Sequence, residues 1–234
     1  MLTMSMSKDE LASQIADDFR QLKRWVDIRA DSHYNRIWRR GERHLTDTWR
    51  SNNGNEWTWM IDATSDERAS LTFFTTINTD VGRFVFKPQI TDTGFIILAF
   101  LPHFYKRYRE RMKLGPKLKP LALIRRYFRN NATAVQTVKK DGRIEMTTDE
   151  GIGLGHFLNW NIRLLRTFIT PNMAYDGQIE RFADSEAMRK EQCMNKPIYS
   201  DEVQRELRMF GLCAADLMVK FKEEHQLNNN NKTE

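Results

Sequence analysis

The 234-residue sequence has little cysteine and no long apolar run. Only Cys193 and Cys213 occur, and their spacing fits neither a disulfide framework nor a zinc site. The longest uninterrupted apolar run extends from Phe95 to Leu101, far short of the roughly 20 residues that span a bilayer. The N-terminus has neither a basic start nor an apolar stretch, which predicts no signal peptide. We therefore expect a cytoplasmic protein with no membrane partner.

Signatures of several enzyme classes are also missing. The sequence contains no H-E-x-x-H, no G-x-S-x-G and no Walker A pattern. Its paired carboxylates, such as Asp9/Glu10 and Asp149/Glu150, are typical of helix starts or turns rather than of a metal cage. These absences disfavour a two-metal nuclease, and we expect no metal and no cofactor.

One segment carries all the excess positive charge. The net charge is +6, yet residues 101–140 hold twelve Lys and Arg against the single acid Glu110, so this segment carries +11 and the remainder −5. Such a block attracts polyanions, of which nucleic acids are the commonest in a cytoplasm. We expect a nucleic acid as partner, with RNA favoured over DNA. An acidic protein partner, or a solvated basic face without a specific role, is the alternative.

Hydrophobic spacing predicts an α+β fold: a largely antiparallel sheet with an N-terminal helical pair, a central basic helix pair and a long C-terminal helix. A capping box at Ser7 and Glu10 opens the first helix, and the second helix follows His33 and reaches Trp49. The turn-rich segment 51–55 is the best candidate domain boundary. The expected units are a helical pair over residues 1–50, a core over 56–180, a C-terminal helical segment over 181–227 and a disordered tail over 228–234.

Within the core, four β-rich runs at 57–61, 71–77, 83–87 and 95–101 predict an antiparallel meander, with the last run as a central strand covered on both faces. Pro102 opens a helix that ends near Lys113, and a second helix starts near Pro120. Four more strands are expected at 134–139, 143–147, 151–157 and 161–170, with Asp141-Gly142 as a hairpin turn.

The helix that follows the central strand holds the main candidates for chemistry. His103, Arg107 and Arg111 lie at i, i+4 and i+8 and therefore share one face. Histidine can move a proton near neutral pH, and arginine binds phosphate and stabilises charge that develops during phosphoryl transfer. These residue types suffice for metal-independent cleavage of RNA through its 2′-hydroxyl. The alternative is a helix that only binds, with a first-turn histidine that caps or packs.

Other basic residues on the helix pair and on the last strand are candidate nucleic-acid contacts. They are Lys106, Arg109, Lys113, Arg125, Arg126, Arg129, Arg163 and Arg166.

Three glycines alternate along the predicted strand 151–157. Gly151, Gly153 and Gly155 leave room for close approach by a helix, another backbone or a ligand. Close packing is favoured over a phosphate loop, because the G-x-G-x-x-G pattern is absent and no helix begins there. His156, among apolar neighbours on the opposite face, is a weaker candidate acid or base.

A strand, a helix with His-x-x-x-Arg-x-x-x-Arg, a second helix and further strands follow one another over residues 94–170. This order resembles small toxin-type ribonucleases of the barnase–EndoU–colicin–RelE group, RelE-like domains in particular. The resemblance implies His103 as the proton-transfer residue, with Arg107, Arg111 and one strand arginine as phosphate and transition-state ligands. Such toxins are far shorter than this chain, and a related scaffold can persist as a binding or regulatory protein.

The function that we expect is therefore that of a nucleic-acid-engaging protein, with metal-independent, toxin-like ribonuclease activity as its enzymatic form. The alternative is a non-catalytic module of a mobile element or phage that binds nucleic acid or another protein.

Overall fold

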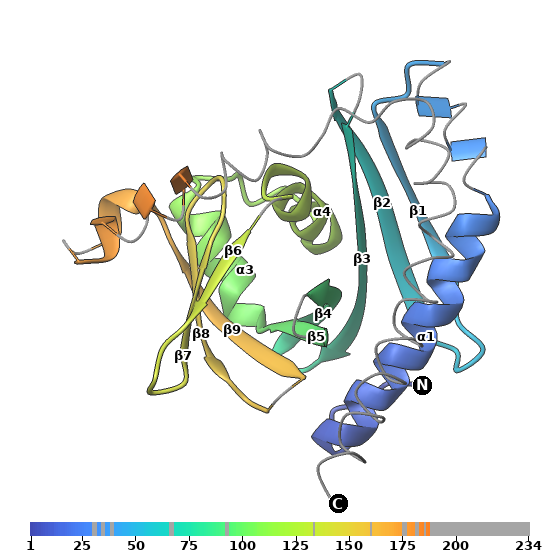
Figure 1. Cartoon of the computed structure of the whole chain (residues 1–234), viewed down its shortest axis with the longest axis horizontal. Coiled ribbons are helices and arrows are strands. Elements are labelled where there is room, and N and C mark those ends of the chain that lie inside the picture. Colours follow the sequence, from blue (N-terminus) through green and yellow to red (C-terminus); the bar gives the residue numbers. More distant parts are fainter. Residues whose placement is uncertain are drawn as a thin grey trace, which may run out of the picture.

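A computed structural model describes residues 1–29, 32–33, 36–37, 40–65, 68–91, 94–132, 134–159, 161–174, 177–180, 183–184 and 186–187. These residues form an α+β fold built on one nine-stranded sheet with the order β1-β2-β3-β4-β5-β9-β8-β7-β6 (Figure 1). None of the described helices has both the length and the apolar content that a membrane span requires.

The sheet consists of two antiparallel meanders. The first contains β1 (His44–Arg50), β2 (Glu56–Ser65), β3 (Arg68–Thr79), β4 (Gly82–Thr91) and β5 (Gly94–Phe100). The second contains β6 (Val135–Val138), β7 (Arg143–Thr147), β8 (Ile152–Phe157) and β9 (Ile162–Ile169), and a 3₁₀ turn (Pro171–Met173) follows it. A parallel ladder between β5 and β9 joins the two meanders, so the sheet is mixed although most of its ladders are antiparallel.

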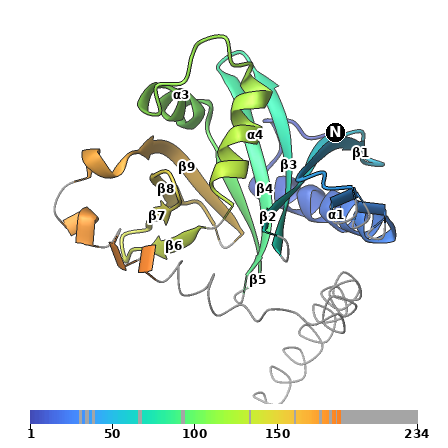
Figure 2. The same cartoon turned by 90° about the horizontal axis from the view of Figure 1, so that it is seen from above.

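Helices cover both faces of the first meander. Helix α1 (Lys8–Ile28) lies on one face, and α3 (Pro102–Arg111) and α4 (Pro120–Asn130) lie on the other (Figure 2). Alternation along β5 sends Ile97 into the core under α1 and Leu98 into the core under α3 and α4. This arrangement confirms the prediction of a central strand covered on both faces.

Helix α1 begins as the sequence predicts. The Glu10 amide donates to Ser7 Oγ at 3.2 Å, and the Ser7 amide donates to Glu10 Oε2 at 2.8 Å, so both halves of the capping box are present. Each bond satisfies an amide that the helix start leaves without a backbone partner.

The prediction of a second N-terminal helix that reaches Trp49 is wrong for residues 44–50, because His44–Arg50 forms strand β1. Leu45 and Trp49 are four residues apart, a spacing that fits a helix turn and also one face of a strand. Seven residue pairs join β1 to β2, and this ladder satisfies those backbone groups of the segment that face β2. The spacing alone could not separate the two structures.

The expected boundary at 51–55 is also wrong, because this segment is the hairpin turn between β1 and β2. The Ser51 amide donates to the Asn55 carbonyl at 2.9 Å. A fully buried carboxylate, Asp18 of α1, accepts hydrogen bonds from Asn53, Asn55 and the Trp57 indole. The turn therefore holds α1 against the sheet rather than separating two units.

The C-terminal helical segment 181–227 and the tail 228–234 lie outside the described residues, apart from residues 183–184 and 186–187.

Candidate nucleic-acid interface

Helix α3 is amphipathic, and its apolar side decides which residues reach solvent. Phe104, Tyr105 and Tyr108 are buried, and the Phe104 ring meets Phe100 of β5 edge-to-face at 5.0 Å. Pro102 occupies the first turn, where its missing amide costs no hydrogen bond. The opposite side of α3 is left with His103, Lys106, Arg107, Glu110 and Arg111.

The structure brings His103 and Arg107 together. Arg107 Nε donates to His103 Nε2 at 3.1 Å, and Arg107 also pairs with Glu110 at 2.8 Å. The His103 Nε2 lone pair is therefore occupied, which leaves the ring proton on Nδ1. His103 can accept a proton at Nε2 only after Arg107 moves away.

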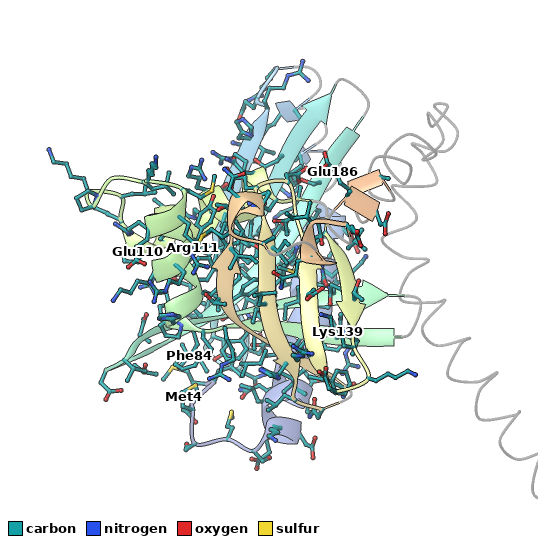
Figure 3. The ribbon with its side chains drawn as sticks, turned by 90° about the vertical axis from the view of Figure 1, so that its left-hand side faces the viewer. Met4, Phe84, Glu110, Arg111, Lys139 and Glu186 are labelled. Atoms are coloured by element: carbon teal, nitrogen blue, oxygen red, sulfur yellow. The ribbon has the colours of Figure 1, made fainter. Side chains whose placement is uncertain are left out.

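Arg111 lies one turn further along α3. One of its terminal nitrogens is buried without a hydrogen-bond partner, and burial, followed by the nearby Arg107, lowers the pKa of Arg111. Figure 3 shows Arg111 on α3 and Lys139, which follows β6, at separate places on the molecule.

Four of the predicted nucleic-acid contacts have partners within the protein. Arg109 donates to the carbonyls of Gly115, Pro116 and Leu118 and so fixes the loop between α3 and α4. Arg126 pairs with Glu150, Arg129 pairs with Asp62, and Arg163 NH1 donates to Gln136 of β6.

Glu150 is the centre of the largest of these groups. Its side chain is 15% exposed and accepts hydrogen bonds from Tyr108, Asn130 and Asn131 in addition to the Arg126 pair. Burial raises the pKa of Glu150, but the hydrogen bonds outweigh burial and leave this pKa below its usual value. Glu150 thus ties both helices to the turn between β7 and β8, a role that its sequence neighbours do not reveal.

Four lysines around the α3–α4 loop have no such partner. Lys106, Lys113, Lys117 and Lys119 are exposed, and among the described residues none of them has an ion pair. Lys113 adopts a left-handed backbone conformation, with φ of 51°, directly after α3. We call these residues the lysine loop.

An open cavity of about 640 Å³ adjoins the lysine loop. Tyr105, Leu123 and Ile124 form its apolar part, and Arg83, His103 and Lys106 also line it. The Tyr105 hydroxyl is buried without a hydrogen-bond partner, and burial raises its pKa well above the usual value. The cavity therefore combines an apolar wall with several cations.

The two strand arginines do not join this surface in the way that the sequence suggests. β9 pairs with β5, but Arg163 donates to Gln136 of β6 and not to a residue of α3. Burial lowers the pKa of Arg163, and its Nε has no partner. Arg166 is exposed where the register between β8 and β9 shifts.

The glycines of β8 serve close packing, as the sequence predicts. A Cβ on Gly153 would lie 3.2 Å from the Phe104 ring, and a Cβ on Gly155 would lie 1.9 Å from the Leu164 carbonyl oxygen. A helix side chain and a neighbouring backbone thus occupy the space that the glycines leave. The His156 side chain of the same strand is exposed, and its ring has no hydrogen-bond partner among the described residues.

Sequence reasoning missed a cluster on β1, β2 and α4. Asp62 Oδ1 contacts His44 Nδ1 at 2.8 Å and Arg129 Nε at 3.0 Å. His44 fell in a segment expected to be helical, and its partners lie far away along the chain, so no local pattern could reveal the cluster. The described residues contain no group of three or more side chains suited to hold a metal.

Comparison with protein-family models, with curated proteins and with solved structures finds no match for this chain. Its function therefore has to be inferred from its own residues.

Proposed function

We propose that this protein binds RNA through the lysine loop and the adjoining cavity. The observation that carries the proposal is the group of four exposed lysines that have no ion pair among the described residues. Unpaired ammonium groups at one surface attract phosphates and release counterions when they bind. An acidic protein would meet the same charges, but the apolar wall of the adjoining cavity also suits an unstacked base. A cytoplasmic location is consistent with such a partner.

The test is fluorescence anisotropy with a short labelled single-stranded RNA over a range of salt concentrations. The variant reverses three charges of the loop, Lys113→Glu, Lys117→Glu and Lys119→Glu. Each lost phosphate contact removes about 0.7 from the slope of log affinity against log salt on a single strand, so the slope should fall by about 2.

A matched control reverses Lys8, Arg24 and Arg50, three exposed cations away from the loop, to glutamate. It changes the net charge equally and should leave the slope close to that of the wild type. Equal losses in both variants would mean non-specific attraction to a basic protein. Unchanged binding by the loop variant would refute the proposal and favour a protein partner.

Metal-independent RNA cleavage by His103, Arg107 and Arg111 is the second candidate function. It is favoured by the place of His103 in the cavity lining and by its contact with Arg107. This reading, which the resemblance to RelE-like ribonucleases also implies, predicts that His103→Ala loses cleavage in EDTA while RNA affinity is unchanged. If no cleavage is seen but charge reversal at Arg107 and Arg111 weakens RNA binding, α3 only binds RNA and does not cleave it.

A further inference from the structure

A buried carboxylate connects two exposed groups at the far end of α4. His44 of β1 lies directly opposite Asp62 of β2 in the ladder, and Arg129 reaches Asp62 from the last turn of α4. The Asp62 side chain is 6% exposed, whereas His44 and Arg129 are 51% and 40% exposed. The anion is thus inside the protein, and the two groups that it orients face solvent.

This geometry prepares His44 for proton transfer. An ionised carboxylate only accepts hydrogen bonds, so His44 Nδ1 donates to Asp62 and the Nε2 lone pair is available. A carboxylate that fixes the tautomer and orientation of an imidazole, and stabilises the imidazolium that forms, is a recurring arrangement for general bases. His103 has the opposite arrangement, because Arg107 occupies its Nε2.

Arg129 supplies a phosphate ligand beside this base. Its Nε contacts Asp62, while no hydrogen bond within the described protein uses its two terminal nitrogens. Guanidinium groups next to a proton-transfer residue stabilise the charge that develops on phosphoryl oxygens. Arg125, one turn earlier on α4, has a buried Nε without a partner.

The same edge of α4 faces β2 and β3. Leu121, Arg125 and Arg129 are spaced by four residues and share one side of the helix. Leu121 lines a small cavity of about 120 Å³ together with Thr58 and Phe74 of these strands. From Pro120, beside the lysine loop, to Arg129 the helix rises about 14 Å, a distance that a short stretch of RNA backbone can cover.

We propose that His44 is the proton-transfer residue of an RNA-cleaving site, with Arg129 as ligand of the scissile phosphate and Asp62 as positioning residue. The inference rests on the proposed RNA binding and places the chemistry at the opposite end of α4 from His103. His44 Nε2 takes the proton of a 2′-hydroxyl, and the 2′-oxygen attacks phosphorus. The bond from phosphorus to the 5′-oxygen breaks, the 5′-oxygen takes a proton from water, and the imidazolium returns its proton to solvent. The products are a 2′,3′-cyclic phosphate and a 5′-hydroxyl end.

The experiment incubates the full chain with end-labelled single-stranded RNA in EDTA and compares wild type, His44→Ala, Asp62→Asn and His103→Ala. The affinity of each protein is measured separately with a 2′-O-methyl RNA that cannot be cleaved by this route. General-base catalysis contributes roughly 10²- to 10⁴-fold, so His44→Ala should lose at least 100-fold in kcat while its affinity stays constant. Added imidazole should restore cleavage by this variant, which structural damage would not permit.

Asp62→Asn keeps the shape of the side chain and removes its charge, so kcat should fall while affinity and thermal unfolding change little. Cleavage that is lost in His103→Ala and kept in His44→Ala overturns the assignment to His44 and favours the second candidate function.

Cleavage by His44→Ala at the wild-type rate, or a loss that imidazole does not restore, overturns the assignment. A wild-type protein that binds RNA without cleaving it overturns the catalytic site and leaves the proposed binding intact. Absence of binding to the 2′-O-methyl RNA overturns the proposed function itself.

Discussion

Replacement of Lys87 by methionine is expected to stabilise the protein at neutral pH. Lys87 lies on β4 opposite Leu98 of β5, and its ammonium group is 5.3 Å from the centre of the Phe128 ring on α4. The described structure gives this ammonium neither a hydrogen bond nor an ion pair, so only the aromatic ring offsets the loss of hydration. Burial lowers the pKa of Lys87 from 10.5 to about 8.

The pKa difference between the unfolded and folded states gives the size of the effect. Each pKa unit corresponds to about 1.4 kcal/mol, so a charged Lys87 at pH 7 costs the folded state about 3 kcal/mol. The unfolded chain holds this proton up to pH 10.5, whereas the folded chain releases it near pH 8. Between these values the wild type therefore gains stability as the pH rises. The destabilisation caused by Lys87 falls to about 1 kcal/mol at pH 10.

The assay is equilibrium unfolding in urea at pH 7, 8, 9 and 10 for the wild type, Lys87→Met and a control, Lys140→Met. Lys140 is exposed near the turn between β6 and β7, so its replacement should change stability little at any pH. The difference from the wild type also cancels the contribution of buried tyrosines, which titrate in all three proteins. A Lys87→Met protein that is less stable at pH 7, or an advantage that does not shrink with pH, would refute the reasoning.

Three further predictions concern the packing and the caps of the fold. Ser7→Ala should cost about 1 kcal/mol of unfolding free energy by removing a helix cap, and an unchanged urea midpoint would contradict the capping box. Gly155→Ala should cost about 3 kcal/mol of unfolding free energy or prevent folding, because the new Cβ would lie 1.9 Å from the Leu164 oxygen. The matched control is Gly115→Ala, which has nothing within 4 Å of its new Cβ and should leave stability nearly unchanged. Glu150→Gln should cost about 1–3 kcal/mol at pH 7. Since the folded pKa of Glu150 is lowered, the wild-type advantage should disappear as the pH falls below the ordinary value of 4.5, and parallel acid-unfolding curves would contradict this account.

The sequence predicted those elements that carry a clear local signal. The unbroken apolar run of β5, the turn at Asp141-Gly142 and the proline at the start of α3 each have a local cause, and the structure agrees with all three. The segment His44–Arg50 had no such signal, because apolar residues four apart suit a helix and a strand equally. Pairing with β2, which no local pattern shows, decides its structure.

The candidate sites divide in the same way. The approach of His103 to Arg107 follows from helix geometry alone, and the structure bears it out at 3.1 Å. The partners of Asp62 and Glu150 come from elements far apart in the chain, so their groups become visible only when the sheet has placed them. From the sequence we also expected the basic residues 101–140 to act as one charged block. Several of its arginines instead pair with groups of the protein itself.

The parallel ladder between β5 and β9 has a consequence for the order of folding. Among the described strands, every other ladder joins neighbours along the chain through a short connection, so each meander needs little loop-closure entropy to form. The ladder between β5 and β9, which begins at Ile97 and Ile162, closes a long loop of chain that contains α3, α4 and three strands. Pairings between residues so far apart in sequence form slowly. The two meanders can therefore assemble as separate cooperative units, and their union is the step that sets α3 against β9.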